Sequence, residues 1–238
     1  MPHPFQMPET HIERIVSRQG REHTSEPFET PKTPLVVVDM QVYFMDENSM
    51  AGCPVGQTVV DNVNRLAEAV RNTGGIVIWI QNLAPMDTSV SWKTLHERYT
   101  PDKADLRVEL MSRGAEPFEL WPTLDVREDD YRVVKRRYSA FIQGSSDIEL
   151  ILKDNSIETL LGWFVATNVC CECTARDAMM LNFRTLMVSD GCATSTDEEH
   201  ENSLKAFYLN FGDVQSTDEV IARLEASAKR NVPADAAE

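Results

Sequence analysis

The chain is 238 residues long and carries 23 Lys and Arg against 38 Asp and Glu, a formal charge of −15 at pH 7. Hydrophobic residues make up 42%, enough to fill the core of one domain, and 10 Gly and 12 Pro are too few for a disordered or collagen-like chain. The acidic balance argues against nucleic acid as a partner, because binding phosphates requires a basic face.

No membrane segment or export signal is expected. The longest apolar runs, 35–38 and 76–80, have the length of strands and fall far short of the roughly 20 residues of a membrane-spanning helix. The first 30 residues lack the apolar stretch of a secretory signal. Five cysteines, an odd number in a chain without such a signal, do not suggest a disulfide framework. We therefore expect a cytoplasmic protein.

Two regions are distinguished along the chain. Residues 1–33 have no sustained apolar period and end in a Pro-rich stretch, which predicts an extended N-terminal arm, although residues 12–18 could form a helix. From residue 34 short apolar runs alternate with amphipathic stretches. Strands are predicted at 35–39, 76–80, 131–135, 159–165, 186–190 and 213–215, and helices at 59–71, 147–152, 170–182, 198–209 and 218–229.

The predicted strands are mostly apolar runs, as in parallel strands buried on both faces. Their alternation with helices predicts an α/β fold, a three-layer α/β/α sandwich with a mainly parallel six-stranded sheet, over residues 34–230. Residues 231–238 are assigned to a C-terminal tail. The stretch 83–125 is interpreted as a long insertion with a helical piece near 92–99, and such insertions often shape a site.

Candidate functional residues lie where the predicted strands end, because ligands of parallel sheets bind beyond the carboxyl ends of the strands. Taken alone, each has an ordinary structural explanation. Asp39 could cap a turn, Lys135 could be a solvated strand end, and Cys170 could be a small buried hydrophobe. Gln81 and Asn82 also follow a strand, and an amide can bind a carbonyl or amino group.

Together, a thiol, a carboxylate and an ammonium make a nucleophile set. At a helix N-terminus Cys170 is expected to gain thiolate character, and Lys135 would add to it. Asp39 could take the thiol proton and deliver it to a leaving amine. Histidine is a poor candidate for this base, since three histidines lie in the arm, one in the insertion and one at a helix start expected to be exposed: His3, His11, His23, His96 and His200.

Three motifs, in order, resemble those of the isochorismatase-like cysteine hydrolases. They are Val38-Asp39-Met40-Gln41, the stretch Lys135-Arg136-Arg137-Tyr138-Ser139-Ala140-Phe141, and the segment from Gly162 to Ala178 that contains Cys170. The resemblance covers about residues 34–224 and implies a Rossmann-like isochorismatase fold.

The same resemblance assigns roles to individual residues. It implies that Cys170 is the nucleophile, Asp39 the general base and acid, and Lys135 the group that orders the carboxylate. The oxyanion hole would consist of the backbone N–H groups of Ala166 and Cys170, with a cis peptide bond between Val165 and Ala166. Two further thiols in the same segment, Cys171 and Cys173, are expected to pack in the core.

The branch of the family is indicated by the stretch after the second strand. Metal-dependent nicotinamidases carry an Asp-x-His motif there, whereas residues 81–87 contain no imidazole. No metal and no cofactor are therefore expected. The resemblance is closest to the ureidoacrylate and N-carbamoyl amidohydrolases, and it implies substrate contacts from the side chains Asn82, Gln81, Tyr138 and Phe141.

The expected activity is cleavage of a C–N bond in a small amide, ureido or N-carbamoyl compound through a Cys170 thioester, with release of ammonia. One alternative is vinyl-ether hydrolysis of isochorismate, in which Asp39 acts as an acid and no thiol is needed. Another is a non-catalytic binding domain, in which Cys170 reacts with iodoacetamide no faster than a free thiol. The resemblance also implies a homo-oligomer, a dimer or tetramer, whose 1–33 arms could wrap a neighbouring subunit.

Overall fold

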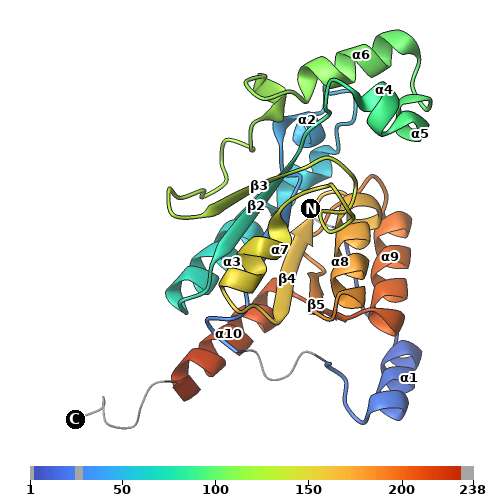
Figure 1. The fold of residues 1–238 in the computed structure, drawn as a ribbon. Coiled ribbons are helices and arrows are strands. Elements are labelled where there is room, and N and C mark those ends of the chain that lie inside the picture. Colours follow the sequence, from blue (N-terminus) through green and yellow to red (C-terminus); the bar gives the residue numbers. More distant parts are fainter. Residues whose placement is uncertain (1–2, 25–28, 232–238) are drawn as a thin grey trace.

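The computed structural model describes residues 3–24 and 29–231, and one six-stranded sheet lies at its centre (Figure 1). All neighbouring strands are parallel, in the order β3-β2-β1-β4-β5-β6. The strands are β1 (Leu35–Val38), β2 (Val77–Asn82), β3 (Tyr131–Lys135), β4 (Thr159–Phe164), β5 (Arg184–Val188) and β6 (Asp213–Gln215). The predicted α/β fold is confirmed. Strand order reverses between β1 and β4, which creates a crevice at their carboxyl ends.

Helices cover both faces of the sheet (Figure 1). The apolar side chains of β1 alternate between two cores: Leu35 and Val37 pack in one, and Val36 and Val38 in the other. The first core includes α3 (Val60–Asn72) and α10 (Thr217–Asn231); the second includes α7 (Ile148–Asp154), α8 (Glu172–Met180) and α9 (Asp197–Asn210). None of the helices in the described part of the chain is long and apolar enough to span a membrane.

Strands β1 and β4 approach each other closely at Gly162. Its φ is +126°, and a Cβ atom there would lie 2.5 Å from the backbone oxygen of Val36. Only glycine tolerates both the backbone angle and this contact. The glycine therefore allows the two strands that border the crevice to pair.

The insertion between β2 and β3 forms a cap beyond the carboxyl ends of the strands, drawn in green in Figure 1. The helical piece predicted near 92–99 is present but shorter than that range: α5 (Lys93–His96) lies within it. A second single turn, α4 (Thr88–Ser91), precedes it, and the two are separated by Trp92 at φ −144° and ψ 56°. Helix α6 (Pro101–Leu110) was not predicted. Only Ala104 and Arg107 of this helix are buried, and its sequence has no apolar stripe by which it could have been predicted.

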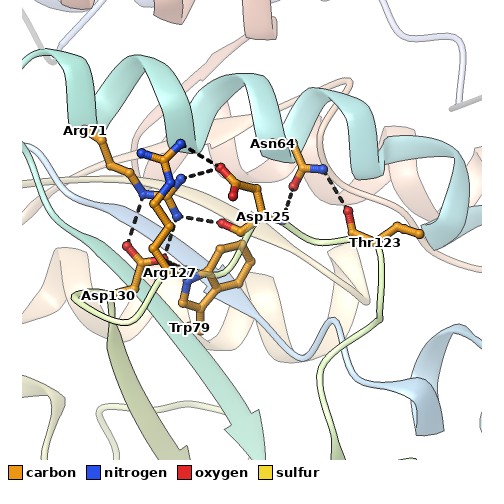
Figure 2. A network of polar contacts seen from close by, with 7 residues as sticks. All are labelled: Asn64, Arg71, Trp79, Thr123, Asp125, Arg127 and Asp130. Atoms are coloured by element: carbon orange, nitrogen blue, oxygen red, sulfur yellow. Dashed lines mark hydrogen bonds and ion pairs between the residues drawn. The ribbon is translucent and has the colours of Figure 1, made fainter.

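The returning part of the insertion is held against α3 by a network of polar contacts (Figure 2). The guanidinium of Arg71 donates to Asp125 Oδ2 (2.8 Å) and Asp130 Oδ2 (2.6 Å). The indole N–H of Trp79 on β2 also donates to Asp130 (2.8 Å), and Asn64 donates to the carbonyl of Thr123 (2.9 Å). These contacts anchor the base of the cap to the sheet.

The N-terminal arm is not extended throughout. Residues Glu9–Gln19 form α1, which ends at Gly20 in the left-handed conformation and packs near α9, with Ile15 buried and Arg18 donating to Leu209 O (2.8 Å). A short amphipathic helix gains its stability from tertiary packing, which explains why its sequence signal is slight. The clasp around a neighbouring subunit stays a prediction, and residues 232–238 of the predicted tail lie outside the described residues.

Candidate active site

The structure brings Asp39, Lys135 and Cys170 together at the carboxyl ends of β1, β3 and β4. Nζ of Lys135 donates to Oδ2 of Asp39 at 2.8 Å, and both side chains are buried. Cys170 lies in a π-helical turn, Thr167–Cys171, between β4 and α8, and its thiol is close enough to both groups to affect their pKa values. The other carboxylate oxygen of Asp39, Oδ1, is buried and has no hydrogen-bond partner among the described residues.

The backbone around this cluster is unusual for non-glycine residues. Asp39 has φ 55°, Trp163 97° and Phe164 111°, and the peptide bond between Val165 and Ala166 is cis, as predicted. Positive φ angles are uncommon for such residues, above all for aromatic ones. They are concentrated where β1 and β4 end, which is also where the three polar groups meet.

Burial and charge together set the protonation of the site. Burial raises the pKa of Asp39, and the neighbouring Lys135 offsets only part of this rise. The carboxylate in turn keeps the pKa of Lys135 above its usual value despite burial. We infer a buried ion pair whose charges cancel, with a carboxylate more basic than one in water.

The Cys170 thiol has a strongly raised pKa, first because it is buried and second because it faces the Asp39 carboxylate; Lys135 opposes this shift without cancelling it. The expectation of a stabilised thiolate is therefore wrong for the resting site. With Asp39 and Lys135 already neutral as a pair, a thiolate would add an uncompensated buried charge. Proton loss from the thiol must accompany its attack on a substrate.

The turn after β4 leaves a backbone donor near Cys170. Thr167 N donates to Ala193 O (2.9 Å), whereas Val169 N and Cys171 N donate to Ala166 O (3.1 and 3.3 Å). The N–H of Ala166 itself donates to none of the residues that the structure describes. The geometry thus keeps one of the two predicted oxyanion donors available, and the role of both stays a prediction.

Two of the four predicted substrate contacts lie beside the cluster. The amide of Asn82 is close enough to Asp39 to lower the pKa of that carboxyl. Tyr138 lines a pocket of about 400 Å³ together with residues of the insertion and with the residue before Cys170, namely Trp92, Thr94, Leu95, Arg98 and Val169. Both residues therefore remain candidates for binding the substrate.

The other two predicted contacts, Gln81 and Phe141, do not line this pocket, and their contact with substrate stays a prediction. The side chain of Gln81 donates to Phe118 O (2.9 Å) and lines a different pocket, because neighbouring residues of a strand point to opposite faces. Phe141 packs in the core with its ring 5.9 Å from that of Phe183. The strand-end argument places Gln81 and Asn82 at the same edge but does not tell which of the two faces the cluster.

Gln41 supports the site but was not predicted to do so, although it belongs to the motif Val38-Asp39-Met40-Gln41. Gln41 is fully buried, donates to Asn82 O (3.2 Å) and Phe118 O (2.7 Å), and accepts from Asn82 N (2.6 Å). It therefore ties the end of β1 to the end of β2 and to the cap. Its position in the Asp-Met-Gln motif is the sequence feature that could have identified this role.

The remaining cysteines do not form a disulfide or a common functional site. Cys171 is buried, as predicted, but Cys173 is half-buried, so the core assignment is wrong for this residue, and all five thiols are free. Within residues 3–24 and 29–231, no group of three or more His, Cys, Asp or Glu side chains could hold a metal ion.

His200 supports the turn that carries Cys170 and is not exposed, contrary to the prediction. The ring is fully buried, and its Nδ1 lies 3.0 Å from Oγ1 of Thr167. The ring of His3 stacks on it at 4.6 Å and is held by Thr194 N (3.1 Å) and Asp197 Oδ1 (2.5 Å). The N-terminal segment therefore packs against the helix that backs the turn.

This histidine predicts an acid-sensitive fold. Burial, with help from His3, lowers the pKa of His200 from 6.5 to about 4, outweighing the opposing effects of the Ser189 backbone and of Asp197. Below pH 6.5 the His200 side chain becomes protonated in the unfolded chain, whereas in the folded chain it stays neutral until near pH 4. The free energy of unfolding therefore falls as the pH drops through this window, by about 3 kcal/mol at most. Urea denaturation from pH 7.5 to 4.5 measures the decline, and His200→Gln should flatten it.

The matched control is His11→Gln in the arm, a half-exposed histidine on α1. It should leave the pH dependence of the unfolding free energy as in the wild type. Equal slopes for wild type and His200→Gln would contradict the prediction.

Fold and site together define an all-parallel α/β protein with a thiol, a carboxylate and an ammonium buried at the switch point of its sheet. The comparisons with known proteins agree with this class. The isochorismatase domain model matches residues 33–219. The chain belongs to the isochorismatase family of hydrolases.

Several relatives are similar over most of their length. A ureidoacrylate amidohydrolase of Pseudomonas syringae pv. syringae is 31% identical over 202 residues, covering 79% of this chain and 82% of the relative. A probable inactive nicotinamidase of Arabidopsis thaliana is 31% identical over 170 residues, covering 71% and 84%. Among solved structures, a cysteine hydrolase from Pseudomonas syringae pv. phaseolicola has a TM-score of 0.72 at 26% identity, covering 84% of this chain and 96% of that one.

Proposed function

We propose that the protein is a cysteine amidohydrolase that cleaves a C–N bond in a small amide, ureido or N-carbamoyl compound. One observation carries the proposal: a buried thiol at the start of a helix lies beside a carboxylate that is itself paired with a lysine (2.8 Å). This arrangement supplies a nucleophile and a base that can take its proton. The similarity to a ureidoacrylate amidohydrolase supports the same reaction class.

In the first half of the reaction, Sγ of Cys170 attacks the carbonyl carbon while its proton passes to Asp39. The negative charge that forms on the carbonyl oxygen is stabilised by backbone N–H groups, with Ala166 as one donor. Asp39 then gives its proton to the nitrogen as the C–N bond breaks. Ammonia leaves, and a Cys170 thioester remains.

In the second half, water attacks the thioester carbon and gives one proton to Asp39. The C–S bond breaks, the acid product leaves, and the proton returns to sulfur. Lys135 remains protonated throughout, which prevents Asp39 from holding a proton in the resting state. Every proton taken by Asp39 is thus returned, and no cofactor enters the cycle.

The vinyl-ether alternative uses Asp39 as an acid and leaves the thiol without a role, although Cys170 occupies the position facing this acid. The non-catalytic alternative gains some weight from the relative described as a probable inactive nicotinamidase. Alkylation by iodoacetamide does not separate these cases, because the raised pKa of Cys170 predicts slow alkylation for an active enzyme as well.

A substrate panel tests the proposal. Wild type is assayed for ammonia release from ureido acids, N-carbamoyl amino acids, biuret-type ureas and simple amides, and for pyruvate release from isochorismate. We expect ammonia from at least one ureido or amide compound and no pyruvate. The proposal is wrong if wild type is inert on all the C–N substrates, and pyruvate release would establish the vinyl-ether alternative.

A further inference from the structure

Helix α6 of the cap carries a buried arginine whose charge no acidic group of the described chain balances. Arg107 is only 6% exposed, and its guanidinium has neither a hydrogen bond nor an ion pair with any described residue. A buried arginine usually has an acidic partner, whereas the Arg107 nitrogens, none of which is among the fully buried atoms without a partner, open to solvent-accessible space. Arg71 shows the usual solution, since it binds Asp125 and Asp130 (Figure 2).

A second donor without an acceptor lies beside the same part of the cap, in a cluster against which Val108, the residue after Arg107, is packed. Tyr43, on α2 (Val42–Met45), is 1% exposed, and its hydroxyl is buried without a hydrogen-bond partner in the described part of the protein. Burial raises the pKa of Tyr43 to about 12, while the nearby charge of Arg107 acts in the opposite direction. A guanidinium and a phenol O–H that both lack acceptors suit an anion.

These donors belong to segments that continue from the candidate active site. Tyr43 follows Asp39 by four residues and packs in one cluster with Ala84, two residues after Asn82. The pKa of Tyr138 is raised mainly by burial. The charge of Cys170 adds to this rise, and the charge of Arg107 opposes it. Tyr138 also lines the 400 Å³ pocket between the cap and the turn that carries Cys170. One phenol therefore lies within electrostatic reach of both the thiol and the buried arginine.

We propose that Arg107 and Tyr43 form an anion subsite that binds the carboxylate of the substrate while its ureido or amide group faces Cys170. The inference rests on the proposed function and deepens it, because it restricts the substrate to C–N compounds that carry a carboxylate. A carboxylate matches the planar fork of a guanidinium and still has lone pairs left to accept from the Tyr43 hydroxyl. The ligand satisfies donors that the protein leaves unpaired.

A matched pair of probes tests the subsite: 3-ureidopropionate and its neutral analogue 3-ureidopropan-1-ol. We expect wild type to prefer the acid in kcat/KM. Arg107→Met should reduce the ratio of acid to alcohol by about 10- to 100-fold, the effect of losing hydrogen bonds to a charged group. Tyr43→Phe should reduce it several-fold, mainly through KM. Arg113→Met, which removes an exposed arginine from the other pocket, should leave the ratio unchanged.

A binding measurement keeps this test independent of turnover. In the Cys170→Ala background, calorimetry should show binding of 3-ureidopropionate that is lost with Arg107→Met and weakened with Tyr43→Phe. If wild type hydrolyses none of the C–N substrates but this binding pattern is found, the proposed reaction is refuted and the subsite is supported. Unchanged binding in both variants would overturn the subsite, and so would Arg107-dependent binding of inorganic phosphate without binding of 3-ureidopropionate.

Discussion

Replacement of Cys170 by Ala is expected to reduce ammonia release by about 10⁴-fold or more, because the covalent route is lost as a unit when its nucleophile is removed. Cys170→Ser should be nearly as inactive, since a hydroxyl is a far weaker nucleophile beside the same carboxylate. Rapid mixing with substrate and intact-mass measurement should show an acyl adduct on wild type only.

The control is Cys173→Ala, which removes a half-buried thiol three residues further on without touching the ion pair. It should retain most of the wild-type rate and form the same adduct. Full activity of Cys170→Ala, or an adduct that maps to Cys173, would contradict the assignment of the nucleophile.

Replacement of Lys135 by Met is expected to affect stability and activity together. Removing one partner of a buried ion pair costs about 3–5 kcal/mol, because the other charge stays buried without compensation. Without Lys135 the pKa of Asp39 rises further, which favours the protonated carboxyl and weakens the base. The turnover should fall by about 10²- to 10⁴-fold.

The double variant Lys135→Met with Asp39→Asn separates these two effects. It removes both charges, so the free energy of unfolding from urea titration should recover a large part of the loss. Ammonia release should remain as low as in Lys135→Met, because the base is absent. Recovery of activity together with stability would show that the pair acts only as a structural element.

Much of the fold followed from local patterns. The apolar run of β1 and the amphipathic stripe of α3 each identify an element by itself, and their alternation along the chain requires parallel strands with crossovers. Asp39, Lys135 and Cys170 could be grouped for the same reason, since the carboxyl ends of parallel strands lie at one edge. The short helices of the cap were beyond this reasoning because α6 buries too few apolar residues to produce a period.

The errors concern residues whose surroundings come from distant parts of the chain. His200 begins a helix rich in acidic residues and looks exposed, but His3 and Thr167 enclose it. The thiolate expected at Cys170 depended on a helix N-terminus and a lysine, whereas burial beside Asp39 favours the thiol. In each case the deciding contact joins residues more than thirty positions apart.

By itself the sequence determined the fold class, the residues at the strand ends and the family resemblance, because periodicity and motif spacing are local properties of the chain. The tertiary structure alone decided which strand-end side chain faces the cluster, the protonation of Cys170 and the unbalanced burial of Arg107. These properties depend on burial and on the sum of neighbouring charges, and both arise only when the cap, the sheet and the turn after β4 come together.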